Sequence, residues 1–116
     1  MQIKNSNCSL DLELSNDRRT LTVGLSGEID HHSAVWVRSE IDAVILRERP
    51  ERTVIDLFGI DFMDSSGIGL IMGRYTRMQS VGGELCVIRP NARVMKIFLM
   101  AGLDRLVRIE KGENDR

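Results

Sequence analysis

The chain has few aromatic side chains and few cysteines, and each shortage excludes a class of protein. Only 4% of its 116 residues are aromatic, so the stacking platforms that bind single-stranded nucleic acid are not expected. The two cysteines, Cys8 and Cys86, are too few for a disulfide framework and indicate a reducing compartment. Because Cys86 lies in an apolar run, we expect it to be a small core residue.

The chain also lacks a strong charge and a long apolar run. Its formal net charge of −1 argues against nonspecific binding to nucleic acid. No apolar run is long enough to span a membrane, and no apolar signal region follows Met1, so we expect a cytoplasmic protein without a membrane partner. A length of 116 residues suits one domain, residues 1–116, with an ordered core at roughly 9–110. Such a domain needs no disulfide or metal to fold.

The first part of the chain predicts a β-hairpin followed by a helix. Two runs alternate between apolar and polar residues, as half-exposed strands do, with the polar turn 16–19 between them. We expect Gly27 to break the second strand, and either Asp30 or Ser33 to cap the helix that follows. The helix would end before Pro50. The apolar positions are Leu10, Leu12, Leu14, Leu21, Val23 and Leu25 in the hairpin, and Ala34, Val37, Ile41, Val44 and Ile45 in the helix.

The second part predicts three further strands and two helices. Residues 53–58 are apolar on both faces, which is typical of a central parallel strand, and Asn91 would cap the last helix. The order β-β-α-β-α-β-α-β predicts an α/β fold with a mixed, mostly parallel sheet flanked by helices. The expected inward residues are Ile68, Ile71, Met72, Tyr75 and Met78, then Val94, Ile97, Phe98 and Ala101; the last strand would hold Leu106, Val107 and Ile109.

The segment 61–69 is the most informative stretch, because a strand leads into it and a helix leaves it. Asp64 and Ser65 lie where that helix begins, and the backbone N–H groups there are unpaired and the helix dipole is positive. A serine hydroxyl at this place either caps the helix or is presented to a partner. A phosphate on it would lie where a helix favours an anion. We interpret Ser65 as a switch.

Catalysis by this serine is not expected. The nucleophile elbow G-x-S-x-G requires glycine two residues on each side of the serine, whereas Ser65 has Met63 and Gly67 there. The only histidines, His31 and His32, precede the serine, which is not the chain order of that class of hydrolase. We therefore do not expect a serine hydrolase.

Cofactor and metal sites are not expected either. Gly67, Gly69 and Gly73 form G-x-G-x-x-x-G, one residue longer than the dinucleotide fingerprint, so we favour small residues that let the helix pack closely on its sheet. The adjacent His31 and His32 point in different directions on a helix and have no completing ligands nearby.

Two groups of residues are candidates for contact with a partner. Trp36, Met95 and Leu99 are apolar but lie off the predicted core stripes, which leaves an interaction surface and chance exposure equally open. The second group is acidic and follows two strands whose carboxyl ends share one sheet edge. Its members could cap helices, contact a partner, or do both. They are Glu28, Asp30, Asp61 and Asp64.

Five segments together form a recognisable pattern, in which G-E-I-D-H-H precedes D-S-S-G-I-G. The chain resembles the anti-sigma factor antagonists of the STAS domain family, and most of all its sporulation members, which free sigma factor F. D-S-S-G-I-G alone is moderately specific, and its combination with the upstream motif is a strong signal. The matching segments are residues 25–32, 62–69, 73–75, 81–84 and 101–103.

The resemblance implies a single STAS-type domain that has no enzymatic activity, binds an anti-sigma factor and thereby releases a sigma factor. The partner would be an ATP-bound serine kinase that phosphorylates Ser65, and a PP2C-type serine phosphatase would reverse the modification. Asp30 would contact the kinase, and Asp64 would shape the acceptor. The residues expected to bind the partner are Asp30, His31, Asp64, Ser65, Ser66 and Gly67.

One departure from the family pattern concerns which partner is bound. The family stretch L-F-D-M-S-G-L reads I-F-L-M-A-G-L at residues 97–103, so Leu99 replaces an acid. Alternatives are a STAS module of another regulatory or transport system, or a nucleotide-sensing binding module.

Overall fold

The structure is a computed structural model that describes residues 1–5 and 7–111. It confirms an α/β fold with a six-stranded sheet in the order β1-β2-β3-β4-β5-β6. The first three strands are antiparallel and the pairs from β3 to β6 are parallel. The elements are β1 (Gln2–Asn5), β2 (Cys8–Leu14), β3 (Thr20–Ile29), α1 (His31–Glu48), β4 (Arg52–Met63), α2 (Ser65–Ser80), β5 (Glu84–Ile88), α3 (Ala92–Met100), the 3₁₀ turn η1 (Leu103–Arg105) and β6 (Arg108–Glu110).

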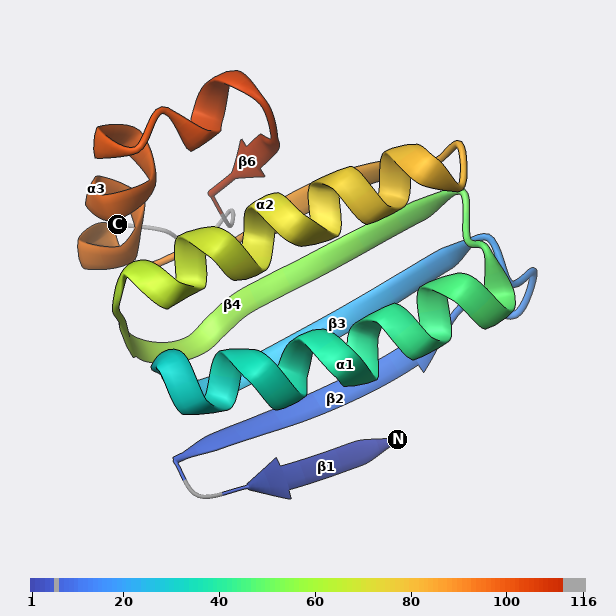
Figure 1. Ribbon diagram of the computed structural model, residues 1–116, viewed down its shortest axis with the longest axis horizontal. Helices are drawn as coiled ribbons and strands as arrows, with labels where there is room; N and C mark the ends of the chain where they lie inside the picture. The colour runs from blue at the N-terminus through green and yellow to red at the C-terminus, as the bar shows by residue number, and fades with distance from the viewer. Residues whose placement is uncertain (6, 112–116) are drawn as a thin grey trace.

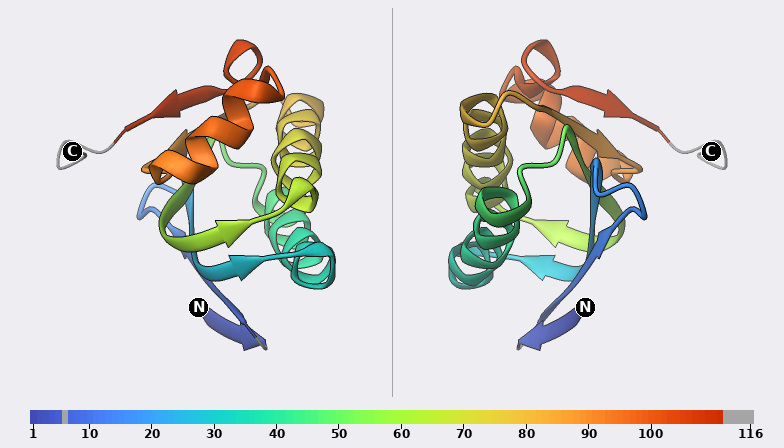
Figure 2. Two further views of the ribbon diagram at one scale, coloured as in Figure 1. Left: turned by 90° about the vertical axis from the view of Figure 1, so that its left-hand side faces the viewer. Right: turned by 90° about the vertical axis from the view of Figure 1, so that its right-hand side faces the viewer.

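Helices α1 and α2 lie side by side across one face of the sheet, and α3 lies at its β6 end, away from that pair (Figures 1 and 2). The core lies between the sheet and these helices. Both cysteines are buried, as predicted for Cys86, although only Cys8 belongs to this core cluster. Among the described residues, none of the helices combines the length and apolar character that crossing a bilayer requires.

Three strand predictions were wrong. Strand β1 was not predicted, because only Ile3 of its four residues is even partly buried and no alternation is visible. Gly27 does not break β3: the strand continues to Ile29 and accommodates Gly27 at φ 96°, which favours glycine. Strand β6 begins at Arg108, after Leu106 and Val107, because η1 occupies the preceding residues.

The inward face of α1 agrees with the prediction, whereas only Ile71 and Met78 of the five residues predicted for α2 are buried. Val37, Ile41, Val44 and Ile45 of α1 are buried, and Ala34 is only partly so. The buried residues of α2 are Gly67, Leu70, Ile71, Arg74 and Met78.

Helix α2 is therefore rotated from the predicted orientation. Met72 is exposed, and Ile68 and Tyr75 are half-buried. In α3, Val94 and Phe98 are buried as predicted, but Ala101 is exposed.

The three apolar residues that were predicted to lie off the core stripes do not behave alike. Trp36 is half-buried and packs against the core, and Met95 is half-buried. Only Leu99 is exposed, at 50%.

Candidate functional site

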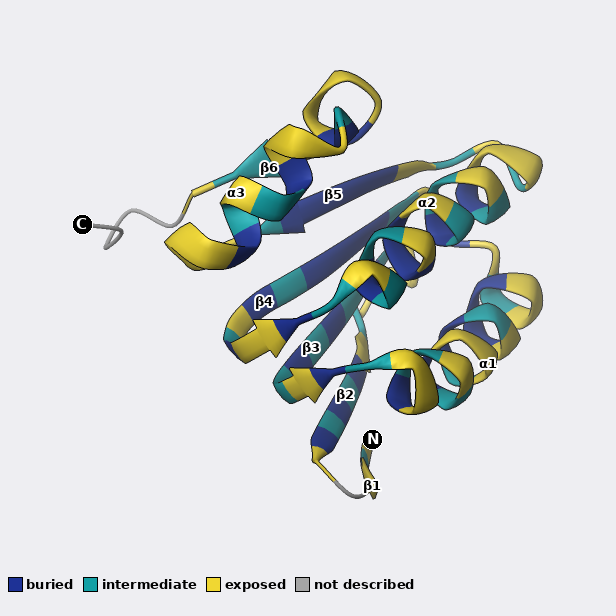
Figure 3. Cartoon of the chain, turned by 60° about the vertical axis from the view of Figure 1, so that its left-hand side comes forward, coloured by how far each residue is buried: buried dark blue, intermediate teal, exposed yellow. Residues whose placement is uncertain are grey.

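Parallel pairing of β3 and β4 brings two helix starts to one edge of the sheet. Ile29 pairs with Met63 at the ends of these strands, and the Asp64 N–H donates to the Ile29 carbonyl at 3.1 Å. Asp30 and Asp64, which follow directly, therefore begin α1 and α2 side by side (Figure 3). The predicted edge is confirmed as an arrangement of residues.

Asp30 is the N-cap of α1, which decides between the two caps that the sequence left open. Its carboxylate accepts from the Ser33 N–H at 2.8 Å, and the Ser33 hydroxyl accepts from the Asp30 N–H at 2.9 Å, which completes a capping box. These bonds, the backbone one foremost and the hydroxyl next, hold the pKa of Asp30 below its ordinary value. The carboxylate therefore stays charged and fixed in direction.

Asp64 performs the same task for α2, and this leaves Ser65 free. The Asp64 carboxylate accepts from the Ser66 N–H at 2.8 Å, and the Asp64 carbonyl accepts from the Gly67 N–H at 3.0 Å. Ser65 is the first residue of α2 and is exposed. Within the described part of the chain, no hydrogen bond involves its hydroxyl, so the serine is presented outward rather than used as a cap.

The first turn of α2, which carries Ser65, packs against Met63 through Gly67. Gly67 is buried, and a Cβ built on it would lie 2.1 Å from Met63 Cγ and 2.2 Å from Met63 Sδ. Close packing therefore requires glycine at this position. Gly69 and Gly73 have no such neighbour within 4 Å, so the predicted packing reason applies to Gly67 alone.

The other predicted residues lie at the same edge of the sheet, and most of them are exposed. His31 and His32 are the first two residues of α1 and are exposed. Glu28 and Asp61 are exposed on the ends of β3 and β4, and Ser66 is half-buried. Among residues 1–5 and 7–111, no group of three or more histidine, cysteine or acidic side chains is placed to hold a metal ion.

Phe62, which lies in the segment 61–69 that the sequence singled out, belongs to this edge, and its exposure was not predicted. It pairs with Glu28 across the strands and is 42% exposed. Strand β4 extends to Met63, so the segment 61–63, which was expected to be loop, is strand. A register shift between Gly27 and Glu28 inserts one extra β4 residue, Asp61, at the glycine that was expected to break the strand.

Comparisons with known proteins agree with this geometry. The profile of the STAS domain matches residues 11–115. The anti-sigma F factor antagonist of Paenibacillus polymyxa is 40% identical over 105 residues, which are 90% of each chain. The anti-sigma F factor antagonist of Lysinibacillus sphaericus is 36% identical over 74% of each chain.

Solved structures show the same fold. The anti-sigma factor antagonist SpoIIAA in its unphosphorylated form superposes with a TM-score of 0.79 at 30% identity, over 90% of this chain and 89% of that one. The phosphorylated form of SpoIIAA, described as a Bacillus cell fate determinant, gives a TM-score of 0.72 at 28% identity, over 90% of this chain and 92% of that one.

Proposed function

The chain belongs to the STAS domain family, and on that premise we propose that it is an anti-sigma factor antagonist that phosphorylation of Ser65 switches off. The observation that carries the proposal is the exposed Ser65 at the first position of α2, with the cap already supplied by Asp64. Two relatives carry the name anti-sigma F factor antagonist, and SpoIIAA has both a phosphorylated and an unphosphorylated form.

The partner in this proposal is an anti-sigma factor that is also an ATP-bound serine kinase. It docks on the edge formed by the starts of α1 and α2, where Asp30, His31 and Asp64 surround Ser65. Ser66 contributes through the first turn of α2, and Gly67 acts from beneath because it is buried. Docking of the antagonist releases the sigma factor from the anti-sigma factor. A PP2C-type serine phosphatase restores the unmodified state.

Phosphorylation acts on the interface and spares the fold. It adds about −1.5 to −2 charges at Ser65, where the amino terminus of α2 favours an anion. The neighbouring carboxylates of Asp30 and Asp64 are close to the added charge, so the edge becomes strongly negative. A differential affinity of about 5.5 kcal/mol moves a two-state population almost fully to one side. We assign this difference to electrostatic repulsion of the kinase and its bound nucleotide, and the chain itself performs no catalysis.

The test uses the candidate kinase, ATP and three variants of the full chain. Wild type and Ser66→Ala should each take up one phosphate that peptide mapping places at Ser65, whereas Ser65→Ala should take up none and still bind. Ser65→Asp should fold like wild type and bind the kinase at least tenfold more weakly. A phosphate mapped to Ser66, or wild-type affinity of Ser65→Asp, would overturn the proposal.

A further inference from the structure

The face of the sheet opposite α1 and α2 carries a hollow of about 530 Å³. Side chains alternate along β2 and β3, so that Leu10 and Leu25 are buried in the core while Ser9 and Ser26 face the opposite side. The hollow lies over these polar positions and is separate from the Ser65 edge. The residues that give it its character are Ser9, Gly24, Ser26, Phe58, Gly59 and Arg89.

A β-bulge turns Phe58 toward solvent at this hollow. Gly24 pairs with Asp56 and Ser26 pairs with Gly59, so two β4 residues face one β3 residue. Phe58 is consequently 72% exposed. The bulge is tied to glycine, because a Cβ on Gly59 would lie 2.5 Å from the Ser26 Cβ.

The backbone and the ring of Phe58 each contact a charged neighbour. The Asp56 carboxylate accepts from the Phe58 N–H at 3.0 Å and from Arg89 Nε at 3.1 Å, and Arg89 Nη2 donates to its other oxygen. The Arg89 guanidinium lies 4.5 Å from the centroid of the Phe58 ring. The ring and the guanidinium together form an exposed aromatic and cationic surface at the hollow.

The floor of the hollow is bare backbone with hydroxyl groups beside it. Gly24 does not need to be glycine for packing, because its nearest neighbour to an added Cβ would be Asp11 Cβ at an ordinary 3.7 Å. A side chain there would instead fill the hollow. The Ser9 and Ser26 hydroxyls lie 2.8 Å apart, and each retains further capacity for hydrogen bonds.

The charges around the hollow leave one cation without a partner. Asp56 is paired with Arg89, and Asp11 lies 3.7 Å from the amino terminus. Lys4 lines the rim, is exposed, and makes no ion pair within the described part of the chain. A ligand that complements these groups therefore carries negative charge.

We propose that this hollow binds a flat aromatic small molecule that carries one anionic group. The aromatic ring stacks on the Phe58–Arg89 wall and lies over Gly24, the Ser9–Ser26 pair bonds its polar atoms, and Lys4 pairs with its anion. This site is additional to the proposed partner switch at Ser65 and does not depend on it.

The experiment titrates the full-length chain with naphthoate and follows backbone amide shifts by NMR. Shifts should concentrate at Ser9, Gly24, Ser26 and Phe58. Phe58→Ala should weaken binding at least tenfold, and Gly24→Val should do the same by filling the hollow while leaving the ring in place. Phe62→Ala is the matched control, because it removes an exposed phenylalanine at the Ser65 edge, outside the hollow. This variant should bind naphthoate as wild type does.

The charge of the ligand is tested with naphthamide, which keeps the rings and lacks the anion. Naphthamide should bind wild type several-fold more weakly than naphthoate does. In Lys4→Gln, naphthamide and naphthoate should bind with equal affinity. Wild-type affinity for naphthoate in both Phe58→Ala and Gly24→Val, or shifts centred elsewhere, would overturn the site. Ser65 should be phosphorylated at the wild-type rate in Gly24→Val, so failure of the hollow and failure of the switch give different results.

Discussion

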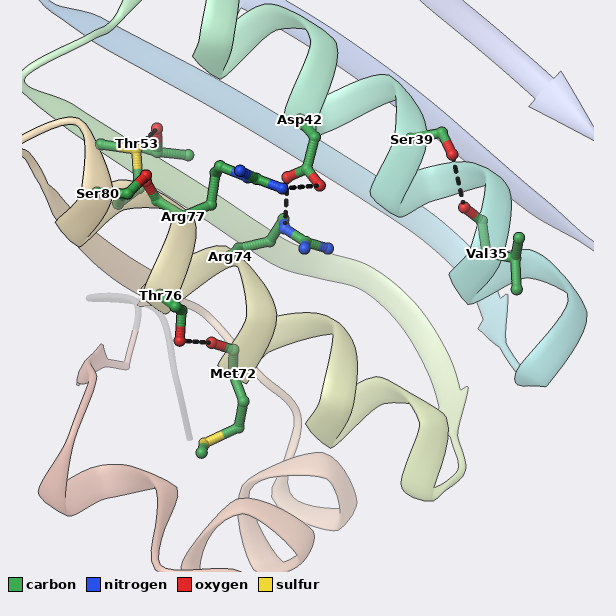
Figure 4. A network of polar contacts seen from close by, with 10 residues as sticks. Val35, Ser39, Asp42, Thr53, Met72, Arg74, Thr76, Arg77 and Ser80 are labelled. Carbon is green, nitrogen blue, oxygen red and sulfur yellow. Dashed lines mark hydrogen bonds and ion pairs between the residues drawn. The ribbon is translucent and has the colours of Figure 1, made fainter.

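Arg74 Nε of α2 lies 2.8 Å from the Asp42 carboxylate of α1, although Arg74 is only 4% exposed (Figure 4). Arg77 Nη2 lies 3.8 Å from the other oxygen of Asp42, so one carboxylate joins two arginines of the neighbouring helix. Burial lowers the pKa of Arg74, and the charge of Asp42 opposes that shift. This ion pair joins α1 to α2. Helix α1 begins after its cap Asp30, and α2 begins at Ser65.

Replacing Arg74 by leucine should lower the free energy of unfolding by about 2 kcal/mol, because Asp42 would lose its nearer partner and keep only the more distant Arg77. Urea unfolding measures the loss. The double variant Arg74→Leu with Asp42→Asn should recover part of it, since no unpaired carboxylate remains. Arg93→Leu, at an exposed position of α3, should change stability by no more than about 0.5 kcal/mol. Equal losses in the two leucine variants would show that the ion pair is not what matters.

The three glycines of α2 should respond in opposite directions to alanine. Gly67→Ala should reduce the free energy of unfolding by about 1 to 2 kcal/mol, because the new methyl group would overlap the buried Met63 side chain. Gly69→Ala and Gly73→Ala should raise it by about 0.5 to 1 kcal/mol each, because alanine is the better helix former and both sites are open. Thermal and urea unfolding of the three variants provide the comparison. A stabilised Gly67→Ala would mean that Met63 moves aside easily.

Periodicity in the sequence was sufficient for most of the fold. Alternation identified the hairpin of β2 and β3, helical spacing identified α1, and Asn91 was correctly assigned as the cap of α3. The position of the candidate site followed from topology, because parallel strands end at one edge and helices must begin there. Asp30 and Asp64 could thus be brought together without coordinates.

Features that depend on a distant partner could not be predicted. The inward position of Arg74 is stabilised by Asp42 on another helix. A prediction from apolar residues alone therefore misplaced the inward face of α2 and assigned Met72, which is exposed, to the core. The two register shifts of β4 arise from its pairing with β3 and expose Phe58 and Phe62. Gly59 lies at the first of these shifts and is a residue type that often marks a bulge, but its type alone does not say which neighbouring side chain becomes exposed.

Cys8 should be unreactive toward thiol reagents while the protein is folded. Burial, with a smaller contribution from Asp30, raises its pKa to about 11, and only the thiolate reacts. Since each pKa unit is a factor of ten, about one Cys8 thiol in a thousand is ionised at pH 8. Labelling with a chromogenic disulfide reagent should therefore follow unfolding, whereas Ser39→Cys, at an exposed position of α1, should react at once. Rapid native labelling of Cys8, mapped by mass spectrometry, would contradict its burial.

Capping by Asp30 and contact of Asp30 with a partner can be separated by two substitutions. Asparagine caps helices about as well as aspartate, so Asp30→Asn should keep nearly wild-type stability at pH 7 and lose only the charge. Ser33→Ala removes the reciprocal hydroxyl, which is buried, and should cost about 1 kcal/mol while leaving the carboxylate in place. Binding to the anti-sigma factor should weaken in Asp30→Asn and stay unchanged in Ser33→Ala. The opposite result would show that Asp30 serves the helix alone.

The pH dependence of stability provides an independent check on the same carboxylate. The folded-state pKa of Asp30 is lowered by its bonds to Ser33, so its contribution to stability is present above the unfolded pKa and is lost as the pH falls through the folded one. Asp30→Asn cannot titrate, and its stability should therefore fall less steeply than that of wild type below about pH 4. Urea unfolding of both proteins between neutral pH and pH 2 measures the difference. Parallel curves of unfolding free energy against pH would mean that the capping bonds do not favour the charged carboxyl group over the protonated one. The capping bonds would then not account for the charge that Asp30 is proposed to present to the partner.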